Sequence, residues 1–171
     1  LMLAGAFFVL FYTWPLKYYG LGEPAVLLVW GPLMVGGTFY VLAAQWSWDV
    51  AWLSLVFALG PTTVLFGKHT DKLEADQSKG VNTLPVIIGE RAARHSVLAM
   101  IGTQYLLSIA LVMAGSFDWP LLLVLASLPT LRQLFTVYGS PKPARPPGHY
   151  PQGIWPLWFS AYAFRHTRRF T

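Results

Sequence analysis

The sequence predicts an all-α protein, a polytopic bundle of transmembrane helices forming one membrane-embedded domain over residues 1–171. Hydrophobic residues make up 55% of the chain and charged residues only 11%, whereas a soluble domain carries about 25% charged residues. The mean hydropathy is +0.49, and the apolar residues gather in stretches close to the roughly 20 residues that cross a bilayer as a helix. Eight Trp and eight Tyr supply aromatic side chains of the kind that anchors helices at the membrane interface.

The apolar stretches predict about five to six membrane segments. Residues 1–12 are expected to form the second half of a span, and further spans are expected at 25–45, 50–67, 96–115 and 119–138. The chain starts inside an apolar stretch, so we expect it to be truncated at its N-terminus, and a further span is expected after Thr171. Pro32, Pro61 and Pro129 lie inside spans, where each can mark a kink.

The last apolar segment, GIWPLWFSAYAF at 153–164, is too short to cross the bilayer as a helix. If it did cross, Arg165, Arg168 and Arg169 would reach a side that otherwise carries no arginine. We therefore expect an interfacial or re-entrant segment, with its aromatic side chains at the headgroups and its arginines on the cytoplasmic side.

The loops between the spans differ in charge. Loops 46–49 and 116–118 contain no Lys or Arg, whereas loops 13–24 and 68–95 contain Lys17, Lys68, Lys72, Lys79, Arg91 and Arg94. Counting the spans puts both basic loops on one side, which the positive-inside rule makes cytoplasmic. The sequence thus predicts an integral protein of the cell (inner) membrane. Its net charge of +5 is expected to meet membrane lipid, with no nucleic-acid partner.

Several kinds of chemistry are excluded or unsupported. Cysteine is absent, which excludes disulfides and thiolate catalysis. No Gly-rich loop between a strand and a helix indicates a nucleotide-binding fold, and no Ser-His-Asp set can be argued. His69 could be a metal ligand or a base, but a loop histidine at an interface is more often simply polar.

An acidic cluster is the first candidate site. The core of the second basic loop reads GKHTDKLEADQSKG and contains Asp71, Glu74 and Asp76. Clustered carboxylate oxygens suit Mg²⁺, which is often shared with substrate phosphates, and Lys68 and Lys72 could bind the remaining phosphate oxygens. The alternative is a solvated helix with ordinary salt bridges between residues three or four apart.

The spacing within the cluster sets a condition on the backbone. Asp71 and Asp76 are five residues apart, which is about 140° around an ideal helix. The two side chains do not share a helical face. If both serve one site, the helix must end or distort between them; alternatively, they serve two metals across a diphosphate.

The first basic loop, YTWPLKYYGLGEP, is the second candidate site. It places Lys17 on the same side of the membrane as Asp71, in a turn that Pro15, Gly20 and Gly22 define. The alternative is a lysine that simply extends to the lipid headgroups. Glu23 stands where the next span begins, and an acid at that position suits a helix N-terminus.

Taken together, these segments resemble the UbiA family of intramembrane prenyltransferases. YTWPLKYYGLGEP, WGPLMVGG and KHTDKLEADQSKGVNTLPVIIGE occur in the family's order. The GLGE segment, the GxxTLPVxxGE pattern and the tail WPLWFSAYAFRHTRRF are similar to the menaquinone-pathway branch, the 1,4-dihydroxy-2-naphthoate polyprenyltransferases.

The resemblance implies a nine-helix bundle that transfers a prenyl chain from a polyprenyl diphosphate to an acceptor, usually aromatic. In this family, two aspartate motifs hold Mg²⁺ and the diphosphate. Asp71 and Asp76 match the second motif, and Tyr12 and Lys17 match residues that assist the diphosphate. The family's aspartates stand four residues apart, so Lys72 and Glu74 remain alternatives for the first ligand. The first motif is expected upstream of Leu1, and the chain by itself is expected to be inactive.

Two other functions fit a polytopic chain. A transporter or channel would carry ionisable residues inside its spans, and Arg132 is the only charge inside a predicted span. Arg132 could face a polar cavity or brace the bundle. A non-catalytic membrane subunit would leave the acidic loop without a role.

Overall fold

The computed structural model describes residues 1–148, 150–151 and 153–171, and this part of the chain is helical, with no β-strand. The predicted all-α class is therefore confirmed. In chain order, the helices are α1 Met2–Phe11, η1 Leu16–Tyr18, α2 Gly22–Leu28, η2 Val29–Gly36, α3 Gly37–Ala43, α4 Trp48–Asp71, α5 Leu73–Ser78, α6 Leu84–Ile88, α7 Glu90–Met113, η3 Trp119–Ser127, α8 Pro129–Gly139 and α9 Phe159–Phe170.

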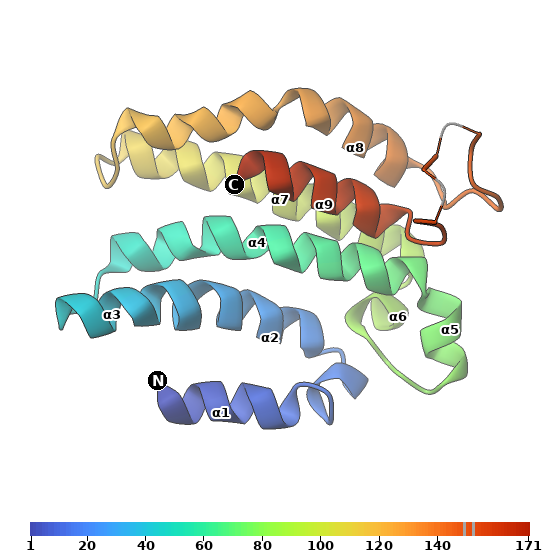
Figure 1. The fold of residues 1–171 in the computed structure, drawn as a ribbon, viewed down its shortest axis with the longest axis horizontal. Helices are drawn as coiled ribbons and strands as arrows, with labels where there is room; N and C mark the ends of the chain where they lie inside the picture. Colours follow the sequence, from blue (N-terminus) through green and yellow to red (C-terminus); the bar gives the residue numbers. More distant parts are fainter. Residues whose placement is uncertain (149, 152) are drawn as a thin grey trace.

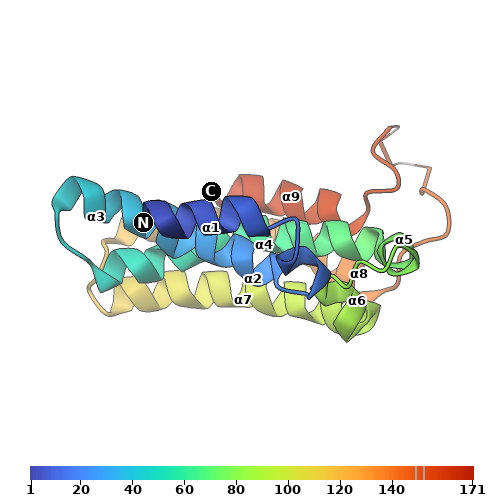
Figure 2. The same cartoon turned by 90° about the horizontal axis from the view of Figure 1, so that it is seen from below.

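Helix α4 is the centre of the bundle. It packs against α2 and η2 on one side, against α9 on another and against α7 behind (Figure 1). Figure 2 shows α7 as a separate layer beneath the layer that contains α1 and α9. The core therefore lies between α4, α7, α8 and α9, where Val56, Val97, Tyr138 and Phe159 are fully buried.

Three helices are long and apolar enough to cross a membrane: Gly22–Ala43, Trp48–Asp71 and Glu90–Met113. A fourth span results if η3 and α8, which meet at an angle of 50°, are counted together. These helices confirm the predicted spans that follow residue 24, and they establish an integral membrane protein. The predicted loop 68–95 was too long, because α4 continues to Asp71 and α7 already begins at Glu90.

The prolines inside the spans have different local effects. Pro32 lies in η2, a stretch of π-helix, and such wider turns accommodate a residue that cannot donate a backbone hydrogen bond. Pro129 opens α8, where the bend from η3 occurs. Pro61 lies inside α4, and the helix continues through it.

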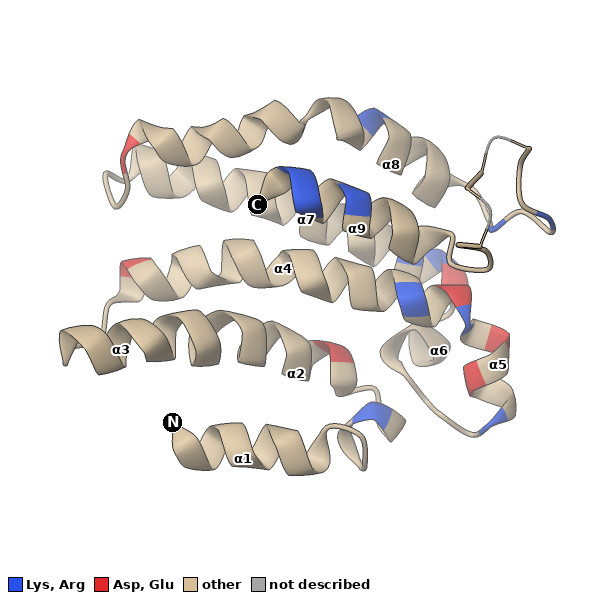
Figure 3. Ribbon diagram, viewed as in Figure 1, with Lys and Arg blue, Asp and Glu red and all other residues tan. Residues whose placement is uncertain are grey.

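The two basic loops lie at the same end of the bundle, as the sequence predicts. Tyr19 and Asn82 form an isolated backbone bridge between them. At the opposite end, the hydroxyl of Ser116 donates to a carboxylate oxygen of Asp49 at 2.7 Å, which joins the two loops without basic residues. Lys, Arg, Asp and Glu gather around α5 and α6 (Figure 3), and we call this end of the bundle the α5 end.

Of the two alternatives for the last segment, the interfacial one does not fit the structure, and the re-entrant one stays a prediction. Helix α9 runs alongside α4, and its Phe159 and Ala163 side chains are fully buried. Close approach is possible because Gly67 of α4 faces the start of α9: a Cβ there would lie 2.7 Å from the backbone nitrogen of Ser160. The segment's short apolar length did not reveal that α9 is amphipathic, with one face packed on α4 and its arginines on the other.

Candidate functional site

A buried carboxylate–imidazole pair joins the two basic loops. Glu23 at the start of α2 and His69 near the end of α4 are 1% and 4% exposed. Nδ1 of His69 lies 2.6 Å from a carboxylate oxygen of Glu23, whose other oxygen accepts from the backbone nitrogen of Leu84 at 3.4 Å. The pair therefore connects α2, α4 and α6. Glu23 was expected at a helix start, but its contact with His69 was not, because His69 was interpreted as a polar loop residue.

Tyr12 and Lys17 lie beside this pair. A Cβ on Gly22 would be 3.8 Å from the ring of Tyr12 and 3.5 Å from the Cα of Lys17. Both residues therefore pack over the first turn of α2, next to Glu23. The structure brings these two predicted residues together at the α5 end, as expected for a common role.

Asp71, the last residue of α4, binds the start of α9. Its Oδ1 accepts from the backbone nitrogen of Phe159 at 2.9 Å, and its Oδ2 accepts from the backbone nitrogen and the hydroxyl of Ser160 at 3.0 and 2.8 Å. Nζ of Lys142 lies 3.7 Å from Oδ1, and the Asp71 side chain is 0% exposed. The carboxylate thus satisfies the first amide groups of α9, as a capping residue does.

Asp76 lies apart from Asp71. The helix ends between them, because Lys72 leaves the helical conformation at φ −115° and α5 starts at Leu73. Oδ2 of Asp76 is buried and accepts no hydrogen bond from any described residue, whereas Glu74 is exposed. Within the described chain, no three His, Cys, Asp or Glu side chains form a metal-binding group. The predicted trio of Asp71, Glu74 and Asp76 is thus not assembled.

The orphaned oxygen of Asp76 nevertheless fits a metal ion. A buried carboxylate oxygen without a donor is unfavourable unless a cation or a hydrogen bond satisfies it. Mg²⁺ typically takes one or two protein carboxylates and completes its shell with water and substrate phosphates. Asp76 offers one such carboxylate, whereas Glu74, two residues earlier in α5, points to another face of that helix.

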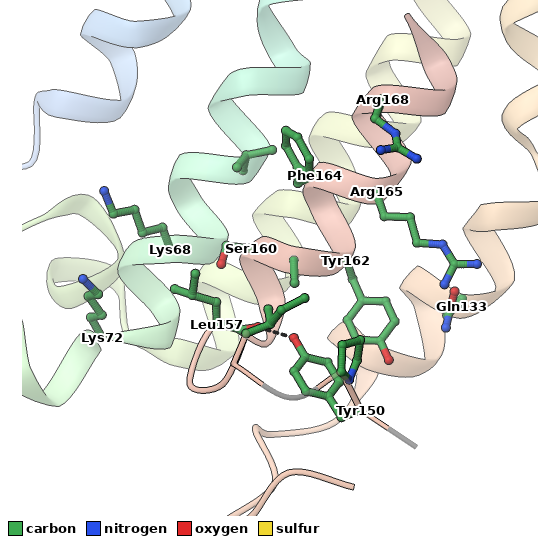
Figure 4. A pocket seen from close by; sticks show the side chains of 14 residues that line it. Lys68, Lys72, Gln133, Tyr150, Leu157, Ser160, Tyr162, Phe164, Arg165 and Arg168 are labelled. Carbon is green, nitrogen blue, oxygen red and sulfur yellow. Dashed lines mark hydrogen bonds between the residues drawn. The ribbon is translucent and has the colours of Figure 1, made fainter. Parts of the chain in front are cut away.

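Lys68 and Lys72 line a cavity of about 790 Å³ between α4, α9 and the segment before α9. Their side chains extend away from α9, whereas Arg165 and Arg168 extend from α9 itself (Figure 4). Among the described residues, neither Lys68 nor Lys72 lies within ion-pair distance of an acid. The surface salt bridges that were the alternative interpretation of these lysines are therefore not formed.

Tyr150 is one of the residues that line this cavity. Its hydroxyl donates to the backbone oxygen of Leu157, and burial, followed by the nearby Tyr162 and the charge of Asp71, raises the pKa of the phenol to about 12. Lys142 lies over the ring of Trp155, 4.9 Å from its centre. Nζ of Lys142 also donates to the backbone oxygen of Asp71 at 3.2 Å, which joins the segment before α9 to the end of α4.

The chain matches the UbiA prenyltransferase family over residues 1–147. It belongs to that family. This UbiA-family chain is 28% identical over 124 residues to a 2-carboxy-1,4-naphthoquinone phytyltransferase of Synechocystis. The aligned region covers 72% of this chain and 40% of that protein. It is also 28% identical over 131 residues to a 1,4-dihydroxy-2-naphthoate octaprenyltransferase of Haemophilus influenzae. That aligned region covers 76% of this chain and 42% of that protein.

A third relative, a digeranylgeranylglyceryl phosphate synthase of Natronomonas pharaonis, is 28% identical over 95 residues, or 54% of this chain and 34% of that protein. The chain therefore spans about two fifths of the length of the first two relatives. No solved structure matches it. Family membership agrees with the resemblance that the two loops predicted.

Proposed function

We propose that this UbiA-family chain is part of an Mg²⁺-dependent prenyltransferase, which moves a prenyl chain from a polyprenyl diphosphate to an aromatic acceptor for quinone synthesis. The single observation that carries the metal role is the buried, unpartnered Oδ2 of Asp76. The names of the naphthoate and naphthoquinone prenyltransferases among the relatives support the aromatic acceptor. We place the α5 end on the cytoplasmic side, because both basic loops lie there.

The reaction breaks the bond between the allylic carbon and the diphosphate oxygen, and the electron pair leaves with the diphosphate. A carbon–carbon bond then forms to the acceptor ring, which releases a proton. When bound, Mg²⁺ neutralises charge on the leaving diphosphate. We assign Asp76 to holding the metal, and the cations Lys17, Lys68 and Lys72 to binding phosphate oxygens.

Tyr12 is assigned to the diphosphate as well, because it packs with Lys17 over Gly22. Asp71 receives a different role. Its two oxygens already accept three hydrogen bonds from the start of α9, so we propose that it positions the end of α4 and does not bind the metal directly. This assignment also fits the four-residue spacing of the family's two aspartates. The residue four positions before Asp76 is Lys72, so Asp71 does not stand at the position of the first aspartate.

The test is Asp76→Ala in the full-length protein, assayed for transfer from a polyprenyl diphosphate to 1,4-dihydroxy-2-naphthoate. We expect Mg²⁺-dependent transfer to be abolished while the bundle stays folded. Asp118→Ala is the matched control, because Asp118 lies in a loop at the opposite end. Unchanged turnover in Asp76→Ala would refute the metal role.

A further inference from the structure

Two adjoining cavities on the α8–α9 side of the bundle carry a strong positive charge. The first has a volume of about 790 Å³ and the second, between α8, α9 and residues 140–147, about 630 Å³. They share Gln133 and Tyr162, and no described Asp or Glu lines either one. Their cationic lining residues are Lys68, Lys72, Arg132, Arg165 and Arg168.

The arginines of α9 lie at membrane depth. The hydroxyl of Thr167 is 3.4 Å from the backbone oxygen of Gly60, and Gly60 stands midway along the membrane-length helix α4. Arg165 and Arg168, on either side of Thr167 in α9, are therefore beside the hydrocarbon core. Charged side chains at this depth are costly without an anionic partner or water, and no described acid lies within ion-pair distance of either arginine.

Three side chains with hydrogen-bond donors line the first cavity on this side. Arg165, Gln133 and Tyr162 line the first cavity together, and Figure 4 shows the guanidinium of Arg165 extending from α9 on the side where Gln133 and Tyr162 are drawn. None of these three groups hydrogen-bonds to another described side chain. An arginine that reaches from membrane depth toward the interface is typical of contact with lipid headgroups.

Apolar surface lies next to these donors. Phe164, Ile154 and Leu157 line the first cavity and are 57%, 39% and 36% exposed. An occupant must therefore combine an anionic head with an apolar chain. The described residues that line these cavities include no carboxylate, so Mg²⁺ would have no protein ligand on the α8–α9 side.

We propose that the α8–α9 side of these two cavities forms a binding site for an anionic phospholipid, whereas Lys68 and Lys72, on the α4 side of the first cavity, remain assigned to the diphosphate. Arg165, with Gln133 and Tyr162, donates to the phosphate oxygens, and Arg132 and Arg168 supply further positive charge. Arginine suits this role because its planar group donates two parallel hydrogen bonds to a phosphate. The acyl chains lie along the exposed face of Phe164.

The test uses full-length protein in nanodiscs of phosphatidylcholine and phosphatidylglycerol, followed by extraction into mild detergent and native mass spectrometry of the lipid that stays bound. We expect the wild type to retain phosphatidylglycerol in preference to phosphatidylcholine. The variant Arg165→Gln/Arg168→Gln is expected to lower that preference about tenfold, equivalent to about 1.4 kcal/mol.

The matched control is Arg145→Gln/Arg169→Gln, which removes two exposed arginines that line neither cavity and should retain the lipid. Arg165→Lys/Arg168→Lys keeps the charge and should retain most of the preference. A wild type without preference for phosphatidylglycerol would overturn the proposal, whatever the variants do. Equal loss in the control pair would also overturn it.

Two further arms separate this site from the proposed catalytic site. A chelator should leave the lipid bound, and Asp76→Ala should keep the lipid while losing prenyl transfer. Release of the lipid by the chelator, or its one-for-one replacement by a polyprenyl diphosphate, would overturn the proposal, because the α8–α9 side of the cavities would then be part of the substrate site.

Discussion

Replacing Asp71 with alanine tests whether α9 is held by a single carboxylate. The substitution removes the acceptor of three hydrogen bonds, two of them from the first backbone amides of α9, and leaves Lys142 without its acid. Loss of a cap costs about 0.5–2 kcal/mol, and a hydrogen bond to a charged group contributes about 1.5–3 kcal/mol. Since these costs overlap, we expect a total of about 2–4 kcal/mol.

The assay is thermal unfolding of the full-length protein in detergent, followed by tryptophan fluorescence. A loss of this size should lower Tm by about 5 °C or more. Asp71→Asn retains an acceptor oxygen and should lose less than half as much, and Asp76→Asn is the matched control with little expected effect. If Asp71→Ala unfolds at the wild-type temperature, Asp71 does not hold α9 and its assignment as a positioning residue fails.

Two further substitutions test the packing of α4. His69→Ala should destabilise the protein by about 3–5 kcal/mol, because it leaves Glu23 as a buried charge without its partner. The double variant Glu23→Gln/His69→Ala should recover part of that loss in the same unfolding assay. No recovery would contradict the pairing of Glu23 with His69. Gly67→Ala should weaken the α4–α9 contact, since the new Cβ would lie 2.7 Å from the backbone nitrogen of Ser160. Gly102→Ala in α7, where nothing lies within 4 Å, should be neutral or stabilising, and equal effects of the two glycine substitutions would contradict the close approach.

The spans and the shared end of the basic loops could be predicted from the sequence because both depend on local composition. Apolar length limits where a helix can cross, and counting spans then places Lys17 and Asp71 at one end. A break between Asp71 and Asp76 was expected only if both carboxylates serve one site, and the alternative was two metals. The helix does end at Lys72, but the two carboxylates do not meet, because Asp71 binds the start of α9.

The partners of the polar residues could not be predicted in the same way. His69 binds Glu23, which lies 46 residues earlier, and Asp71 binds Phe159 and Ser160, which lie 88 and 89 residues later. Spacing along one sequence carries no information about such distant contacts. The packing of α9 on α4 was missed for a related reason: its arginines dominated the interpretation, although Phe159, Ala163 and Phe170 already gave the segment an apolar face.

The helix break at Lys72 separates two carboxylates that differ in how firmly they are held. Asp71 ends a rigid membrane-length helix, whereas Asp76 sits on the six-residue α5, which buries no residue and is followed by Gly80 in a left-handed conformation at φ +67°. Segments with so little buried surface open at low free energy. Hydrogen exchange should therefore be fast in α5 and slow at the end of α4, and a ligand that engages Asp76 should be detectable as new protection confined to those six residues.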